Sequence, residues 1–160
     1  MDGMGPRQSP DLMRELIEQL FPRLRGSDFE ITSPRDRRYN CVAWAANDTR
    51  RWWWPGESPF SFWPAGVRRD ESVATFIEAF ATLGYIVSAS GVHEASVEKV
   101  AIFTSSEGVP THMARQLPNG TWTSKLGGLE DISHIDVNGV AGADYGDVVV
   151  FLERPRPSST

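Results

Sequence analysis

The sequence predicts an α+β fold in which N-terminal helices pack on a C-terminal antiparallel β-sheet of about four to five strands. Three observations lead to this prediction. Apolar residues recur at helical spacing in the first half of the chain, and strand-like apolar runs fill the second half. Between two of those runs lies Asn119-Gly120, and Asn-Gly is the strongest short signal for a hairpin of antiparallel strands.

The first expected element is an amphipathic helix within residues 1–25. Its apolar residues repeat every three or four positions, so they form one stripe along a helix. The stripe consists of Leu12, Met13, Leu16, Ile17, Leu20, Phe21 and Leu24. Residues 26–154 are expected to form the α+β domain itself, and the proline- and serine-rich residues 155–160 a disordered tail.

Two more helices are expected before the sheet. One begins near Cys41 with Asn40 as its N-cap, and the apolar run that follows indicates burial on all sides. The other opens at residues 70–72 and keeps helical spacing until Gly84 ends it. The segment between them, RRWWWPGESPFSFWPAG, is predicted to be irregular. Its aromatic side chains either line a substrate groove or close the core between the two helices.

Four segments are predicted to be the main strands: 98–104, 111–117, 121–125 and 147–153. Shorter strands are expected at 29–31 and 85–87. If Asn119-Gly120 is a two-residue turn, Leu117 pairs with Trp122. That register places His112 and Ser124 on opposite faces of the sheet, because strand side chains alternate.

Composition limits the class of protein. A length of 160 residues, 40% of them hydrophobic and 23% charged, suits one globular domain. No apolar run reaches the about 18 residues that span a bilayer, and no basic-then-apolar leader is recognisable. The predicted compartment is therefore the cytoplasm, with delivery by a specialised secretion system left open.

Charge and cysteine usage limit the partners. The net charge of −5 argues against a nucleic-acid partner, since phosphate binding needs a basic surface. The one basic cluster, around Arg35, Arg37 and Arg38, is interpreted as a solvated loop. A single cysteine forms no internal disulfide, and no Cys/His cluster has zinc spacing, so neither a metal nor another cofactor is expected.

Cys41 is the candidate nucleophile. A lone cysteine often packs as a small hydrophobic residue, which is the structural alternative here. However, the first turn of a helix stabilises an anion, so this position predicts a thiol pKa well below the ~8.5 of a free cysteine.

Among the three histidines, His112 is the candidate general base. It opens the first strand of the hairpin, where a rigid scaffold can hold an imidazole against a thiol. His93 lies in a polar loop, and His134, which is flanked by carboxylates, is expected at the surface. An active pair requires the Cys41 sulfur within about 4 Å of a His112 ring nitrogen.

The segments YNCVAWA and PTHMARQLPNGTWTSKLGG resemble papain-like cysteine hydrolases, most closely the NlpC-type cell-wall endopeptidases and amidases. The likeness spans roughly residues 30–152 and implies a papain-like fold. It also implies that Cys41 attacks, that His112 acts as base and then as acid, and that the backbone N–H of Cys41 stabilises the oxyanion. The chain is also similar to small bacterial proteins that share an N-C-x-A-W-A segment, a Trp-rich loop and a T-S-K-L-G segment.

The resemblance leaves the third catalytic position open. In the NlpC-type branch this position lies about twelve residues after the histidine, which corresponds to Ser124. Because the predicted register turns Ser124 away from His112, Asp131 is the substitute candidate. Candidates for the oxyanion site and cleft are Asn40, Lys125 and Trp54.

The expected function is that of a thiol hydrolase that cleaves an amide or peptide bond. Its substrate would be a peptide or protein, with the peptidoglycan stem as one candidate. The alternative is a catalytically inactive papain-like module for binding or interaction. The sequence indicates neither the oligomeric state nor the specific substrate.

Overall fold

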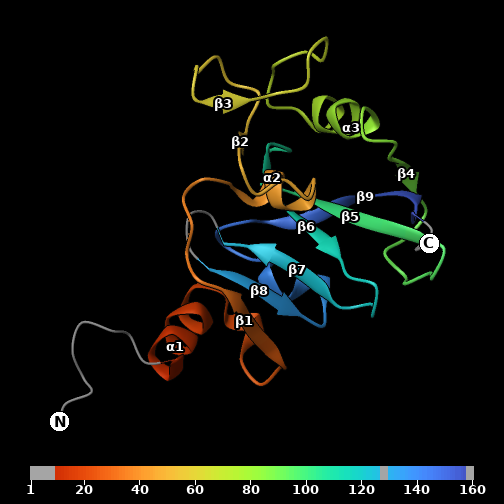
Figure 1. Ribbon diagram of the computed structural model, residues 1–160. Coiled ribbons are helices and arrows are strands. Elements are labelled where there is room, and N and C mark those ends of the chain that lie inside the picture. Colours follow the sequence, from red (N-terminus) through yellow and green to blue (C-terminus); the bar gives the residue numbers. More distant parts are fainter. Residues whose placement is uncertain (1–9, 127–129, 158–160) are drawn as a thin grey trace.

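A computed structural model describes residues 10–126 and 130–157 of the chain and is dominated by one large sheet (Figure 1). The sheet is antiparallel and has seven strands in the order β1-β8-β7-β6-β5-β9-β4. Its strands are β1 (Phe29–Ser33), β4 (Ile86–Ser88), β5 (Val97–Thr104), β6 (Pro110–Gln116), β7 (Trp122–Lys125), β8 (Asp131–His134) and β9 (Asp147–Pro155).

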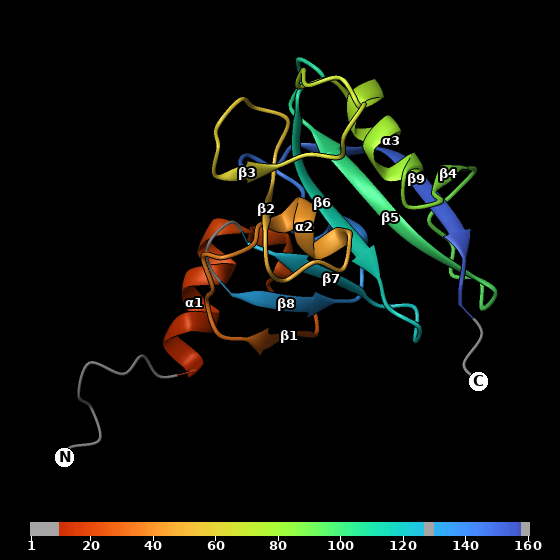
Figure 2. The same ribbon diagram turned by 45° about the horizontal axis from the view of Figure 1, so that its top comes forward.

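Short helices and one small arm surround this sheet. The helices are α1 (Pro10–Leu20), α2 (Cys41–Ala45) and α3 (Val73–Ala81), with 3-10 turns η1 (Pro22–Leu24) and η2 (Val137–Val140). The arm is the parallel pair of β2 (Trp52–Trp53) and β3 (Ser61–Phe62). In both views α1 lies beside β1 and β8, α3 lies beside β4, and α2 crosses the middle of the sheet (Figures 1 and 2). None of the described helices combines the length and apolar character that crossing a membrane requires.

The predicted fold, papain-like helices packed on four or five strands, is wrong. The structure is a seven-stranded antiparallel sheet with few helices, and α2 has only five residues. The sequence understates the sheet because β8 comes from the polar run DISH, which carries no apolar alternation. The short strands β1 and β4 complete the two edges by backbone pairing, which depends little on side-chain pattern.

The hydrophobic core is divided into two clusters by the sheet. One packs α2 and α3 with Met113 and Ile102, and the other packs α1 and η1 with Phe103 and Ala114. Within α1 only Ile17 of the predicted apolar stripe is buried, while Leu12, Leu16 and Leu20 are more than 40% exposed. Phe21 and Leu24, which follow the helix, are buried as predicted.

The hairpin between β6 and β7 has a different register from the predicted one. Gln116 pairs with Trp122, not Leu117. The reason is a three-residue loop: Gly120 N donates to Leu117 O, and Leu117 N donates to Thr121 O. Gly120 has φ +92°, as in the glycine bulge that closes such loops. The shift by one residue turns Ser124 onto the face that carries His112.

The first residue of the predicted tail, Pro155, belongs to a strand. Strand β9 extends through Pro155, and Arg156 N donates to Ser96 O. The last part of the predicted tail, 158–160, lies outside the described residues, as do Gly127 and Gly128 of the second segment that resembles the hydrolases.

Candidate functional site

The start of α2 is held in place by the side chain of Asn40. Its Oδ1 accepts from Ala43 N at 3.1 Å, as the predicted N-cap should, and also from Trp53 N at 3.1 Å. Its Nδ2 donates to Trp53 O at 2.7 Å. The amide therefore clamps α2 to β2. Asn40 is a predicted oxyanion or cleft residue, but these bonds occupy its side chain, which is 4% exposed.

Cys41 is buried but reaches a cavity. It is 7% exposed and lines a space of about 340 Å³ together with Asn40, Trp52, Trp54, Thr111 and Tyr145. Burial raises the pKa of the Cys41 thiol to about 11, although the backbone N–H groups of Met113, Val42 and Cys41 favour the thiolate. The predicted low pKa is therefore wrong: the five-residue helix does not outweigh desolvation. In this structure Cys41 carries its proton at neutral pH.

His112 is buried in the sheet at 1% exposure. Because side chains alternate along β6, Met113 packs in the core cluster of Cys41, whereas His112 contacts Phe103 and Tyr145. The His112 and Tyr145 rings are stacked, with centroids 4.0 Å apart and planes 8° from parallel.

The two predicted catalytic side chains do not bond to each other, and only Cys41 lines the cavity. Tyr145 lines the cavity with Cys41 and stacks on His112, and Thr111 Oγ1 donates to the Tyr145 carbonyl oxygen. No hydrogen bond joins Cys41 to His112, and His112 Nδ1 has no partner in the described part of the chain. The predicted direct pair is therefore not formed in this structure.

The other nitrogen of His112 belongs to a buried polar chain that crosses three strands. His112 Nε2 lies 3.1 Å from Ser124 Oγ, and Ser124 Oγ lies 2.8 Å from His134 Nε2. His134 Nδ1 in turn lies 2.8 Å from the carbonyl oxygen of Asp136. The chain runs diagonally from β6 through β7 to β8.

Hydrogen-bond directions along this chain assign the tautomers. A carbonyl oxygen only accepts, so His134 Nδ1 must carry a proton and donate to Asp136 O. The neutral His134 ring then accepts at Nε2 from the Ser124 hydroxyl. That leaves the Ser124 oxygen to accept from His112 Nε2–H. His112 Nδ1 is consequently the unprotonated nitrogen, with a free lone pair.

Burial keeps both rings neutral. It lowers the pKa of His112 well below its ordinary value, and the nearby His134 acts in the same direction. Burial also lowers the pKa of His134, against the opposing effect of the Asp136 carbonyl and carboxylate. The assigned tautomers are therefore the ones present at neutral pH.

Asp131 and Lys125 lie elsewhere. Tyr39 Oη donates to Asp131 Oδ2 at 2.9 Å, so Asp131 holds a tyrosine and does not orient His112. The Lys125 ammonium lies 5.1 Å from the centre of the Tyr39 ring and is fully buried, and burial lowers its pKa. Lys125 is therefore part of the interior and does not line the cavity with Cys41.

Sequence reasoning missed His134 and set Ser124 aside. Carboxylates around His134 suggested a surface position, yet it is 1% exposed, since DISH forms the strand β8. Its separation of ten residues from Ser124 carries no signal until β7 and β8 are paired. Of the predicted cleft residues, Trp54 does line the cavity, and its Nε1 donates to Glu71 at 3.1 Å.

Residues 30–153 match the family described as "Domain of unknown function (DUF7689)". The chain belongs to this family. No curated protein and no solved structure matches it.

In this DUF7689 domain the chemistry available is that of a thiol and an imidazole. Over the described ranges, no three side chains of His, Cys, Asp or Glu gather as metal ligands would. The cavity offers one sulfur, one threonine hydroxyl and the aromatic surfaces of Trp52, Trp54 and Tyr145.

Proposed function

We propose that the protein is a thiol hydrolase that cleaves an amide or peptide bond, with Cys41 as the nucleophile and His112 as the base. The observation that carries the proposal is the polar chain of Ser124 and His134. It orients His112 so that Nε2 is a donor and Nδ1 is a buried acceptor without a partner among the described residues, and His112 stacks on Tyr145, which lines the Cys41 cavity. A buried imidazole with one nitrogen oriented and the other free is what a general base requires.

The chemical step starts from two neutral groups. As Cys41 Sγ attacks the carbonyl carbon, its proton passes to His112 Nδ1, and the carbonyl oxygen becomes an oxyanion. The imidazolium that forms is stabilised by Ser124 Oγ, which already accepts from Nε2–H. The C–N bond then breaks, and the leaving amine takes the proton from Nδ1. Water, deprotonated by the same nitrogen, hydrolyses the thioester and releases the thiol.

Two parts of the active arrangement form only with substrate bound. Cys41 Sγ and His112 Nδ1 must come within hydrogen-bond reach, and catalytic hydrogen bonds often tighten only in the complex. The oxyanion is assigned to the backbone N–H of Cys41, in the first turn of α2, where helical N–H groups lack an intrahelical partner.

The substrate class follows from the resemblance to NlpC-type endopeptidases and amidases. It supports a peptide amide, with peptidoglycan stem peptides as one candidate and a cytoplasmic protein as another. The apolar walls of the cavity, Trp52 and Trp54, fit a peptide backbone better than a small polar molecule.

The test is hydrolysis of peptide and peptidoglycan-fragment panels by four variants. Cys41→Ser and His112→Ala should each abolish turnover, and the double variant should be no worse than either one, because nucleophile and base act as a unit. Ser124→Ala should lower kcat by about tenfold to a hundredfold, because the tautomer is no longer held. Asp131→Asn, which keeps an acceptor for Tyr39, is the matched control and should keep full activity. Activity that persists in Cys41→Ser would refute the proposal.

The second candidate function is a binding module without catalysis. It is favoured by the neutral Cys41 thiol and by the absence of a hydrogen bond from Cys41 to His112. Iodoacetamide labelling separates the two functions. A hydrolase should label faster when a bound substrate analogue brings the thiol to the base, and His112→Ala should remove that acceleration. If the pH dependence of the labelling rate gives a Cys41 thiol pKa near 11 both with and without the analogue, the binding module is favoured.

A further inference from the structure

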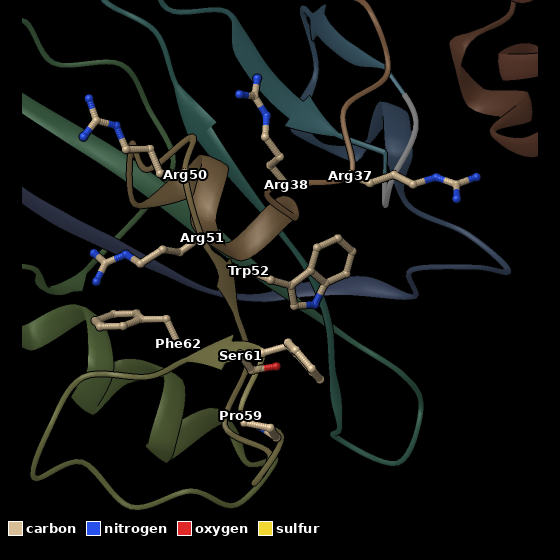
Figure 3. Close-up of a pocket in the computed structure, with 9 residues that line it drawn as sticks. Arg37, Arg38, Arg50, Arg51, Trp52, Pro59, Ser61 and Phe62 are labelled. Carbon is tan, nitrogen blue, oxygen red and sulfur yellow. The ribbon is translucent and has the colours of Figure 1, made fainter.

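A second cavity, of about 610 Å³, lies beside the arm formed by β2 and β3 (Figure 3). Its walls come from the loop before α2, the loop after it, and the arm with the residues that connect its two strands. The lining residues are Arg37, Arg38, Arg50, Arg51, Trp52, Pro59, Phe60, Ser61 and Phe62. Four of these nine residues are arginines and none is acidic, although the chain as a whole has a net charge of −5. The loop around Arg37 and Arg38 is exposed, as predicted from the sequence, and it also forms one wall of this cavity.

Two of the arginines are held in place by aspartates. Arg38 Nε and Nη2 donate hydrogen bonds to the Asp36 carboxylate, at distances from 2.6 to 3.1 Å. Arg51 Nε donates to Asp48 Oδ2 at 2.9 Å, and its guanidinium lies 3.6 Å from the centre of the Phe62 ring. These contacts fix the two side chains before any ligand arrives, which lowers the entropic cost of binding.

The other two arginines supply the unbalanced charge. The guanidinium groups of Arg37 and Arg50 form no hydrogen bond and no ion pair within the described residues. Asp36 and Asp48 each neutralise one of the four arginines, so two positive charges at the cavity remain unbalanced. Figure 3 shows Arg50 and Arg51 on one side of the Trp52 indole and Arg37 on the other.

Trp52 connects this cavity to the Cys41 site. It lines both spaces, so the two cavities share a wall, and a peptide bound at Cys41 would have its neighbouring residues close to the second cavity. Phe60, in the same lining, is 89% exposed and offers an uncovered aromatic surface. Aromatic residues and arginine are enriched at binding interfaces, and this lining combines both.

We propose that this arginine cavity binds carboxylate side chains of an acidic peptide whose scissile bond lies at Cys41. The proposal rests on the hydrolase function and specifies its substrate class. Two separated carboxylates match cations on opposite sides of Trp52, whereas a single phosphate group could engage only one side. A nucleic acid is disfavoured, because its closely spaced phosphates need a more extended basic surface than two unbalanced cations provide.

Binding is measured by calorimetry with the Cys41→Ser variant, so that no turnover interferes. The probes are the capped peptides Ac-(Gly-Glu)3-NH2 and Ac-(Gly-Gln)3-NH2, the oligonucleotide dT6, and inorganic phosphate. The variants are Arg37→Gln and Arg50→Gln, singly and together. Arg25→Gln is the matched control, since Arg25 is an exposed arginine outside the cavity.

The glutamate peptide should bind, and the glutamine peptide should bind about tenfold more weakly. The double arginine variant should weaken binding of the glutamate peptide by about fivefold to tenfold, and added salt should weaken it further. Arg25→Gln should change nothing. Equal affinity for the two peptides, or affinity unchanged in the double variant, would overturn the proposal. Tighter binding of dT6 or phosphate through the same arginines would also overturn it.

Hydrolysis assays with the wild-type protein keep this proposal separate from the proposed function. In one outcome, the glutamate peptide binds through Arg37 and Arg50 while no peptide of the panel is cleaved. That result supports the anion site and rejects the hydrolase. Cleavage that is indifferent to substrate charge supports the hydrolase and rejects the anion site.

Discussion

The two halves of the candidate site are built in different ways. The Cys41 half depends on a loop residue, Asn40, whose amide ties the start of α2 to β2 through three hydrogen bonds. The His112 half depends on strand pairing, because Ser124 and His134 reach it only from the neighbouring strands. One half is held by a local cap and the other by sheet register.

The cap determines where the Cys41 sulfur lies, whereas the polar chain determines which nitrogen of His112 carries the proton. The cap places the sulfur at a cavity but leaves the thiol neutral, because burial outweighs the backbone N–H groups around it. The polar chain sets which nitrogen of His112 is free, although it does not touch the sulfur. Damage to the cap should therefore cost mainly stability, and damage to the polar chain should alter the protonation of His112 as well.

The largest expected effect is that of Asn40→Ala. It removes the cap of α2 and leaves the buried backbone groups of Trp53 unpaired, so the free energy of unfolding should fall by about 3 kcal/mol. Urea denaturation measures the loss. Asn138→Ala, at an exposed asparagine, is the control and should be nearly neutral. A loss for Asn40→Ala as small as that of the control would show that the clamp does not hold α2.

Ser124→Ala should cost about 2 kcal/mol, since it leaves facing nitrogens of two buried histidines without a partner. It should also change the chemical state of His112. Nitrogen-15 NMR of the imidazoles should show Nε2–H on His112 in the wild type and a mixture of tautomers in the variant. Ser133→Ala, on the adjacent strand, should leave the spectrum unchanged. A mixture already present in the wild type would contradict the assigned direction of the chain.

The stability of the His112 half should depend on pH. Both His112 and His134 have lowered pKa values in the folded state, so the unfolded chain binds more protons below the ordinary value of 6.5. The free energy of unfolding should therefore fall as the pH drops from 6.5 toward 5, by up to about 1.4 kcal/mol per pH unit for each histidine.

Urea titrations at several pH values measure this slope. His134→Gln should reduce it by up to half. A slope that His134→Gln does not change would mean that His134 does not titrate differently in the two states.

The smallest effect is expected at the turn that sets the register. Gly120→Ala places a Cβ at φ +92° and 3.3 Å from His93 Cγ, so it should destabilise the hairpin by about 1 kcal/mol. Gly56→Ala is the control, because its Cβ would meet only Trp54 at an ordinary 3.6 Å. If Gly120→Ala is as mild as the control, the glycine bulge does not define the register.

Much of the Cys41 half could be predicted from the sequence. Asn40 caps a buried helix that begins at Cys41, and the main strands lie close to their predicted positions, with β5, β6, β7 and β9 within a few residues. Capping and strand propensity act between residues that are close in the chain, so a short segment contains most of the information. The thiol pKa could not be predicted, because it depends on desolvation by distant elements.

Only the tertiary structure decided the partners of His112. A three-residue loop in place of a two-residue turn shifts the register by one, and in a sheet that single step moves Ser124 from one face to the other. His134 joins because the polar run DISH gains backbone partners on both sides, from β1 and β7. The arginine cavity likewise depends on Arg37, Arg50 and β3 meeting around Trp52. The sequence by itself determined which groups could do chemistry; pairing between distant strands and loops decided which of them meet.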